Sequence, residues 1–285
     1  MKVVILAGGK TNLPGKLKNI PKSLIEIKGR PLLEYQLDLL KKYKLDGDVR
    51  LTLYFGAKDI LKYLKKKDPK GKITGKRGKI AGIEYVIGPK PLGTGGAIRN
   101  AAKDIKKDFL VMNGDVLTNI NLGEFIKFYK KNISEPRFFS SSPFLRAYTP
   151  QILPLEISPL RKRVSYEDIL GAMTVYYTQD GSHLGLVKVK NDRVVEFIAK
   201  PDYQYSGYIN AGFYILSPEI FKLKCLKAKK KNEAFNIEKC FFSELAKNSQ
   251  LIAYVHRGLW TDIGTEARFK IAETIAEKII QQEKI

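Results

Sequence analysis

The chain opens on an apolar run that stops at two glycines. Residues 2–7 read Lys-Val-Val-Ile-Leu-Ala, and Gly8-Gly9 follow directly. Such a run predicts a parallel strand buried on both faces, and the glycines predict a turn at its carboxyl end. A turn without side chains exposes backbone N–H groups to a ligand. Pro21-Lys22 follows at the end of a basic loop, so Lys22 is expected within reach of the same ligand. This start predicts an edge that binds a polyanion such as a nucleotide.

Gly9-Lys10-Thr11 imitates the end of a Walker A loop, but the rest of that motif is missing. A Walker A loop needs a glycine five residues before the Gly-Lys pair, and Val4 occupies that position inside the predicted strand. The P-loop is therefore rejected. A simple strand-end turn with no ligand is the alternative reading of this segment taken alone.

Composition indicates a globular protein with a large positive charge. The chain has 285 residues, 44% of them hydrophobic, and 51 Lys and Arg against 29 acidic residues give a net charge of +22. That charge suits a polyanionic partner, either a nucleic acid or a triphosphate. The lysines, however, are scattered in short clusters such as 65–67 and 229–231, a pattern typical of solvated helix faces. A nucleic acid is thus not the favoured partner.

Cysteine and histidine are too few for a disulfide framework or a nitrogen-rich metal site. Cys225 and Cys240 have no CxxC spacing, which predicts two reduced thiols and a cytoplasmic protein. The opening apolar run is too short for a signal peptide, and no stretch approaches membrane-spanning length. His183 and His256 lie far apart in the sequence, so a bound metal is expected to have oxygen ligands.

Strand-like and amphipathic segments alternate through the first half. Strands are predicted at 2–7, 49–55, 83–87 and 109–112, and helices at 31–43, 57–66, 94–104 and 122–131. This βαβα order predicts an α/β fold, a Rossmann-like and mostly parallel sheet flanked by helices, with a ligand crevice at the carboxyl ends of its strands. The second half adds β structure at 171–178, 184–190, 193–198 and 208–216, and then helices at about 217–227, 236–247 and 265–282.

Residues 132–170 interrupt this rhythm with Ser140-Ser141-Ser142-Pro143 and further prolines. We interpret them as an inserted loop. Because the loop leaves a helix and returns to a strand, it is expected at the amino ends of the strands, opposite the crevice. A linker between two independent domains is the alternative.

Two aspartates follow predicted strands at the expected crevice. Asp115 comes after Asn113-Gly114, and Asp262 lies in Trp260-Thr261-Asp262-Ile263-Gly264-Thr265. Two such carboxylates could converge on Mg²⁺, which is commonly held by one or two carboxylates plus substrate phosphates. A second glycine-rich turn, Leu92-Gly93-Thr94-Gly95-Gly96-Ala97, precedes a predicted helix and could let a flat base lie against the backbone. The alternative interpretation is that these glycines only cap the helix. Lys200 suits a phosphate, and Asn210 suits hydroxyl groups.

Taken in order, these motifs resemble the sugar-1-phosphate nucleotidylyltransferases over nearly the whole chain outside 132–170. The motifs are Leu6-Ala7-Gly8-Gly9, Pro21-Lys22, Leu92–Ala97, Asn113-Gly114-Asp115, Phe197–Pro201, Ile209–Gly212 and Trp260–Thr265. Within that family the chain looks most similar to the mannose-1-phosphate and heptose-1-phosphate guanylyltransferases. The resemblance implies one domain over 1–285, with a nucleotide-binding half (1–131), the inserted loop (132–170), a sugar-phosphate-binding half (171–264) and a C-terminal helix (265–285).

The resemblance also implies the reaction and the roles of the residues. A sugar-1-phosphate oxygen would attack the α-phosphorus of a nucleoside triphosphate and release pyrophosphate, with Mg²⁺ as cofactor and GTP with mannose-1-phosphate as the first substrate pair. The residues implied to act in catalysis are Lys22, Asp115, Lys200 and Asp262, and the two aspartates would hold the metal. Those implied to bind the nucleotide are Leu6, Ala7, Gly8, Gly9, Lys10, Lys22, Gly93, Thr94 and Asp115. Those implied to bind the sugar phosphate are Gly114, Lys200, Asn210 and Gly212.

Three positions depart from the family pattern. Asn12 stands where a phosphate-binding arginine is expected, Ala199 replaces a glutamate, and Gly88 replaces a Gln or Glu that helps to read the base. Lys10 or Lys16 could restore the missing charge, but not the bidentate geometry of arginine. Two alternatives therefore stay open: a non-catalytic relative that binds nucleotide or nucleotide sugar, and a thymidylyl- or uridylyltransferase using glucose-1-phosphate. A homo-oligomer also remains open.

Overall fold

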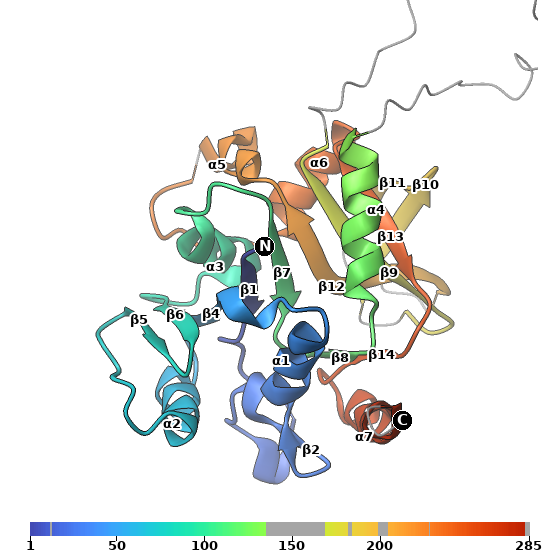
Figure 1. Ribbon diagram of the computed structural model, residues 1–285. Helices are drawn as coiled ribbons and strands as arrows, with labels where there is room; N and C mark the ends of the chain where they lie inside the picture. The colour runs from blue at the N-terminus through green and yellow to red at the C-terminus, as the bar shows by residue number, and fades with distance from the viewer. Residues whose placement is uncertain (12, 135–168, 182–183, 199–204, 228, 283–285) are drawn as a thin grey trace, which may run out of the picture.

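The protein is an α/β structure built on one continuous sheet, seen in a computed structural model that describes residues 1–11, 13–134, 169–181, 184–198, 205–227 and 229–282 (Figure 1). The sheet has ten strands in the order β10-β11-β13-β9-β12-β7-β1-β4-β6-β5. Helices cover both of its faces. The α/β class predicted from the sequence is confirmed.

The first half supplies the parallel part of the sheet. Strand β1 pairs in parallel with β4 and β7, and β4 pairs in parallel with β6, so the carboxyl ends of these four strands share one edge. The elements of this half are β1 (Val3–Leu6), η1 (Gly15–Leu17), η2 (Lys22–Leu24), β2 (Glu26–Ile27), β3 (Arg30–Pro31), α1 (Leu32–Lys42), η3 (Asp46–Asp48), β4 (Val49–Leu53), α2 (Ala57–Lys67), β5 (Arg77–Ile80), β6 (Ile83–Ile87), α3 (Gly93–Ala102), β7 (Phe109–Asn113), β8 (Val116–Thr118) and α4 (Leu122–Ser134).

The second half extends the same sheet with mostly antiparallel pairings. Strand β12 joins the halves by pairing antiparallel with β7, and β9 pairs with both β12 and β13. The turn between β10 and β11 has Asn191 and Asp192 at positive φ, which is the geometry of a tight hairpin. The elements are β9 (Gly171–Thr178), β10 (Leu186–Lys190), β11 (Arg193–Ile198), β12 (Gly207–Leu216), η6 (Pro218–Lys222), α5 (Lys224–Lys227), η7 (Glu238–Phe242), α6 (Ser243–Lys247), β13 (Leu251–His256), β14 (Trp260–Asp262) and α7 (Glu266–Gln282).

Alternating side chains of β1 supply two cores, one on each face of the sheet. Val3 and Ile5 pack with α1, α2 and α4, whereas Val4 packs with α3 and with the η7–α6 segment. A third apolar cluster lies between α7 and the first-half segment that contains β2 and the start of α1. Because Val3, Val4 and Ile5 are all fully buried, β1 is covered on both faces, as its unbroken apolar run predicts.

Two of the predicted helices are interrupted. The segment at 217–227 divides into η6 and α5 because Leu223 adopts an extended conformation between them. The segment at 236–247 begins as the π-helical turn η7 and continues as α6. Of the predicted inserted loop, residues 132–134 belong to α4, and 135–168 lie outside the described residues.

The expectation of two reduced cysteines is wrong for this structure. Cys225 of α5 and Cys240 of η7 form a disulfide, and their Cα atoms are 5.6 Å apart. Spacing along the sequence carries no sign of this pair. The cysteines meet because α5 and η7 pack against each other within the core on the α3 face.

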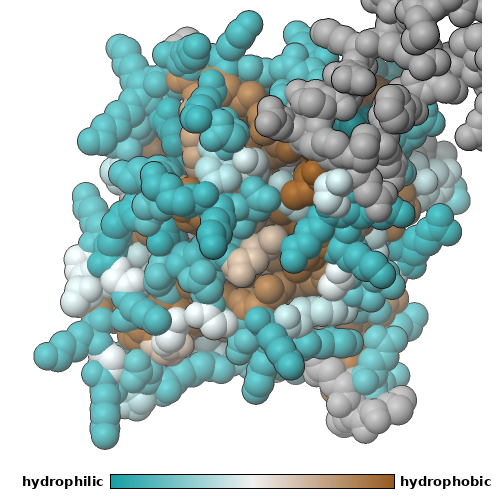
Figure 2. All heavy atoms as spheres, turned by 45° about the horizontal axis from the view of Figure 1, so that its top comes forward, coloured by the Kyte–Doolittle hydropathy of each residue, from teal (hydrophilic) through white to brown (hydrophobic). Residues whose placement is uncertain are grey.

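On the face shown in Figure 2, hydrophilic side chains project from much of the outline, and hydrophobic atoms are visible between them. No helix in the described part of the chain is long and apolar enough to cross a membrane.

Candidate active site

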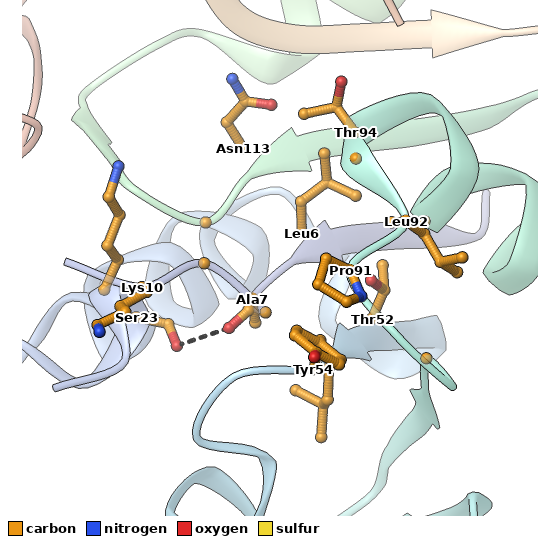
Figure 3. Close-up of a pocket in the computed structure, with 18 of the residues that line it drawn as sticks. Leu6, Ala7, Lys10, Ser23, Thr52, Tyr54, Pro91, Leu92, Thr94 and Asn113 are labelled. Carbon is orange, nitrogen blue, oxygen red and sulfur yellow. Dashed lines mark hydrogen bonds between the residues drawn. The ribbon is translucent and has the colours of Figure 1, made fainter. Parts of the chain in front are cut away.

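A cavity of about 340 Å³ opens at the carboxyl ends of the parallel strands. Its walls are the turn after β1, the ends of β4 and β6, the start of α3 and the turn after β7. Figure 3 shows Leu6 between Asn113 and Thr94 on one side and Pro91, Thr52 and Tyr54 on the other. Ten residues predicted from the sequence line it together: Leu6, Ala7, Gly8, Gly9, Lys10, Lys22, Gly93, Thr94, Gly114 and Asp115.

Backbone contacts hold the first glycine turn against its neighbours. The Ala7 N–H donates to the Thr52 carbonyl at 3.0 Å, and the Phe55 N–H donates to the Gly8 carbonyl at 3.3 Å. A Cβ on Gly8 would lie 2.7 Å from the backbone nitrogen of Tyr54, so no larger residue fits without a shift of the chain. The Ser23 hydroxyl completes the turn by donating to the Ala7 carbonyl at 3.4 Å (Figure 3).

Lys22 is brought back to this turn by its own backbone. The Lys22 N–H donates to the Gly9 carbonyl at 3.0 Å, and Lys10 forms an isolated bridge with Pro21. The loop between them therefore closes on itself, and η2 carries Lys22 into the wall of the cavity. The exposed Lys10 ammonium lies 5.4 Å from the centre of the Phe55 ring.

The second glycine turn is braced by a distant segment that the sequence did not indicate. The Phe235 carbonyl accepts from the N–H groups of Gly95 and Gly96 at 3.0 and 3.2 Å. The Ile237 N–H donates to the Thr94 hydroxyl oxygen at 2.9 Å, which leaves the hydroxyl hydrogen of Thr94 able to donate to a ligand. Of this turn, Gly93 and Thr94 line the cavity, while the Gly95 and Gly96 N–H groups bond to Phe235. We call these contacts with Phe235 and Ile237 the Phe235 brace.

A two-stranded ribbon brings the two predicted aspartates together. Strand β14 pairs antiparallel with β8 so that Asp262 faces Val116, and the Ile263 N–H donates to the Asp115 carbonyl at 3.1 Å. Gly114 permits the close approach of β1 and β7 here, because a Cβ on it would lie 2.4 Å from the Leu6 carbonyl oxygen. Asp115 and Asp262 lie far apart in the sequence, but the ribbon makes them neighbours at the end of the cavity that Asp115 lines.

Each carboxylate has a cation beside it. The Lys22 Nζ lies 2.8 Å from Asp115 Oδ2, and the Arg268 guanidinium contacts Asp262 Oδ2. Burial raises the pKa of Asp262, and the charge of Asp115 raises it further, against the opposing charge of Arg268. Burial alone would lower the pKa of Lys22, but the charge and hydrogen bond of Asp115 outweigh it, so the pKa of Lys22 is raised. The two carboxylates are therefore close enough to interact electrostatically, and each has a cation as its counter-charge.

The donor set at this point suits Mg²⁺. Asp115 and Asp262 offer carboxylate oxygens, and the described residues contain no group of three or more His, Cys, Asp or Glu that could form an all-protein metal cage. Mg²⁺ commonly takes one or two carboxylates and fills its remaining positions with water and substrate phosphates. The two aspartates fit that pattern, since the cavity of about 340 Å³ is lined by Asp115 and has room for part of a substrate.

The predicted sugar-phosphate residues are only partly placed. Asn210 and Gly212 lie on β12, where the pairing with β9 shifts register, and the Gly212 N–H donates to Asn210 Oδ1 at 3.0 Å. Gly212 has φ +84° and packs against Asn113, which lines the cavity, but neither Asn210 nor Gly212 lines it directly. Lys200 lies outside the described residues.

Several polar residues at the site were not predicted. Ser23, Thr52, Tyr54, Asn100 and Asn113 line the cavity, and Arg268 reaches Asp262 from the first turn of α7. The sequence could have indicated Asn113, because it directly precedes Gly114 in the same motif. In the structure, its buried Oδ1 has no hydrogen-bond partner in the described part of the chain. Thr52 interrupts an apolar strand, which is a weaker signal. The sequence gives no indication of Arg268, because its contact with Asp262 depends on how α7 packs.

Comparison with known proteins identifies the family. The model of the Nucleotidyl transferase family matches residues 2–139 and 159–278. The mannose-1-phosphate guanyltransferase of Yarrowia lipolytica is 25% identical over 275 residues, which are 94% of this chain and 62% of that protein. The bifunctional protein GlmU of Methanococcus maripaludis is 27% identical over 268 residues, 93% of this chain and 51% of that protein. The chain thus spans half to two thirds of the length of these curated relatives.

Solved structures share the fold. HddC from Yersinia pseudotuberculosis superposes with a TM-score of 0.62 at 26% identity, covering 96% of this chain and 98% of that one. A UDP-glucose pyrophosphorylase complexed with UDP-glucose superposes with a TM-score of 0.64 at 19% identity, covering 97% and 98%. Because the family model matches most of the chain, and because the residues of the first motifs line one cavity, the chain belongs to the nucleotidyl transferase family.

Proposed function

We propose that the protein transfers a nucleotidyl group from a nucleoside triphosphate to a sugar-1-phosphate, with Mg²⁺ as cofactor. The observation that carries this proposal is the meeting of Lys22, Asp115, Asp262 and Arg268 at one end of a cavity walled by two glycine turns. In the reaction, a phosphate oxygen of the sugar-1-phosphate forms a bond to the α-phosphorus. The bond from that phosphorus to the bridging oxygen breaks, and pyrophosphate leaves with the electron pair.

No general base is needed, because the attacking phosphate is already anionic near neutral pH. The protein has to align two anions that repel each other and to neutralise the charge that develops. The glycine turns let the backbone approach the nucleotide closely, and Lys22 supplies positive charge at the cavity wall. When bound by Asp115 and Asp262, Mg²⁺ would supply further charge neutralisation at the phosphates.

GTP with mannose-1-phosphate is the substrate pair that we propose first. The mannose-1-phosphate guanyltransferases among the relatives support it at 25 to 26% identity. Gly88 leaves the edge of the base without a side chain at that position, so this pair rests on similarity and not on a base contact. A kcat/KM at least tenfold higher for UTP or dTTP than for GTP would replace it with a uridylyl or thymidylyl transfer.

The cytoplasm is the compartment we propose, since nucleoside triphosphates and sugar phosphates are intracellular metabolites. Disulfides are rare in that compartment. The bond between Cys225 and Cys240 would therefore have to resist reduction by cellular thiols, which a titration against glutathione measures directly.

The test is pyrophosphate release with Mg²⁺ across a grid of nucleoside triphosphates and sugar-1-phosphates. Asp115→Asn and Asp262→Asn should each lower kcat by roughly 10²–10³, the scale of losing one preorganised electrostatic group. Asp46→Asn is the matched control, because Asp46 is exposed on η3, away from the cavity. Absence of turnover with every pair, combined with tight nucleotide binding, would favour the non-catalytic relative instead.

A further inference from the structure

Arg268 is held over the Asp262 carboxylate by its place in the first turn of α7. Its guanidinium contacts Asp262 Oδ2, and its Nε donates to the Thr265 hydroxyl oxygen at 3.3 Å. Asp262 Oδ1 in turn accepts from the Gly264 N–H at 2.6 Å. The Arg268 side chain is 19% exposed, so it is mostly enclosed but still partly accessible to solvent.

Two cations and two carboxylates meet within this small region. Lys22 pairs with Asp115, Arg268 pairs with Asp262, and the charge of Arg268 acts on Lys22 as a repulsion. A divalent cation that takes both carboxylates would remove the partner of each side chain cation at once. Lys22 and Arg268 would then be two neighbouring positive groups without a counter-charge, and Lys22 lines the cavity of about 340 Å³.

The first glycine loop contains no arginine that could bind two phosphate oxygens at once. Residues 8–20 include Lys10, Lys16 and Lys18 but no Arg. A lysine is a point charge, whereas a guanidinium offers a planar fork that matches two phosphate oxygens. Within the described residues, Arg268 is the guanidinium in contact with the aspartate pair.

We propose that Arg268 is a catalytic residue whose guanidinium leaves Asp262 when the metal binds and then contacts the phosphate chain of the triphosphate. This inference rests on the proposed function, because it assumes that a metal-bound polyphosphate occupies the site. Arg268 thereby supplies the fork-shaped cation that the first loop lacks.

A purely structural role for Arg268 makes the opposite prediction about the metal. If Arg268 only orients Asp262, then removing it weakens binding of the metal itself. If Arg268 instead competes with the metal for Asp262 and serves the phosphates, then removing it leaves metal affinity unchanged or tighter and weakens binding of the polyphosphate. Two separate titrations distinguish these cases.

The experiment compares wild type, Arg268→Ala, Arg268→Lys and Lys270→Ala. Lys270 is an exposed cation on the same helix, so Lys270→Ala controls for the change in net charge. Mn²⁺ alone is titrated first, followed by pyrophosphate at saturating Mn²⁺, both by calorimetry, and thermal midpoints report folding. Arg268→Gln keeps the side chain stem and replaces Arg268→Ala if the alanine variant does not fold.

We expect Arg268→Ala to bind Mn²⁺ at least as tightly as wild type and to bind Mn²⁺-pyrophosphate about tenfold or more weakly. Arg268→Lys should lie between the two, since it keeps the charge without the fork, and Lys270→Ala should match wild type. Equal pyrophosphate affinity in wild type and Arg268→Ala, or a loss of Mn²⁺ affinity in that variant, overturns the inference. Failure of wild type itself to bind Mn²⁺-pyrophosphate would instead count against the proposed function.

Discussion

Gly8 and Gly9 are adjacent in the chain but have different neighbours. A Cβ on Gly8 would meet the backbone nitrogen of Tyr54 at 2.7 Å, whereas a Cβ on Gly9 would meet only the flexible Lys22 side chain at 3.6 Å. At the scale of single residues, the site therefore depends on a few positions where even one methyl group does not fit.

This difference predicts unequal effects of the same substitution. Gly8→Ala should lower the free energy of unfolding by about 1–3 kcal/mol, because the turn must shift away from β4, while Gly9→Ala should stay within about 0.5 kcal/mol of wild type. Urea unfolding of both variants measures this. Equal losses in the two would mean that the turn relaxes freely around either residue.

His256 is the second residue whose surroundings lead to a prediction. Its Nε2 lies 3.0 Å from both the Thr118 hydroxyl oxygen and the Leu259 carbonyl, which links β13 to β8. Burial lowers the pKa of His256, and the hydrogen bond to Leu259 offsets this only partly. The folded protein therefore keeps the imidazole neutral at a pH where the unfolded chain would protonate it.

Stability should consequently fall as the solution is acidified. An unfolded histidine titrates near about pH 6.5, so the contribution of His256 is complete above that pH. It is lost as the pH falls from there through the lower pKa of the folded state. The free energy of unfolding of His256→Gln should show a shallower decline than wild type between about pH 7 and pH 5. Identical slopes in the two proteins would contradict this assignment.

At the scale of elements, the brace between Phe235 and the second glycine turn connects the disulfide loop to the cavity. Cys225 and Cys240 close the chain segment that contains Phe235, and Phe235 and Ile237 bond to the turn that begins α3. The geometry of Gly93 and Thr94 at the cavity wall is thus set partly by a segment well over a hundred residues away, as the contact between Ile237 and Thr94 illustrates.

Opening the disulfide should affect both stability and nucleotide binding. Replacing both cysteines by serine should lower the free energy of unfolding by about 2–4 kcal/mol, as expected for a cross-linked loop of this size. The KM for the triphosphate should rise while kcat changes little, because the brace supports binding and not the displacement. Wild type treated with dithiothreitol is the control and should behave like the variant. A variant as stable as the oxidised wild type would contradict this expectation.

The elements differ in how well the sequence predicts them. Strands β1, β4, β6 and β7 are evident because each is a short, mainly apolar segment followed by a turn. The β8–β14 ribbon is not evident, since each strand has three residues and its partner lies far along the chain. The same limit applies to the site: local motifs predict Gly8, Lys22 and Asp115, whereas Arg268 and the Phe235 brace depend on packing between distant segments.

At the scale of the whole molecule, the halves share one sheet through the pairing of β7 with β12. Strand β9 runs parallel to β7, because both pair antiparallel with β12, so β9 begins at the edge of the sheet opposite the cavity. The segment between α4 and β9 therefore departs from and returns to the side remote from the candidate site, whatever its own conformation.

Replacing residues 134–168 by a short Gly/Ser linker should consequently leave the chemistry intact. We expect the KM values for both substrates to stay within about threefold of wild type, a difference well under 1 kcal/mol. Changes in stability or in oligomeric state, measured by urea unfolding and by light scattering, are compatible with this prediction. A selective loss of triphosphate affinity in a variant that still folds would show that the segment reaches the cavity.

The β8–β14 ribbon has a consequence for the order in which the site can form during synthesis. Asp115 and the glycine turns belong to the first half of the chain, but Asp262 and Arg268 come only with its last part. A nascent chain released before Trp260 would contain most of the cavity wall and only one of the two carboxylates. Premature termination anywhere upstream of β14 should therefore yield a protein that lacks the paired aspartates, so the proposed activity depends on translation reaching the start of α7.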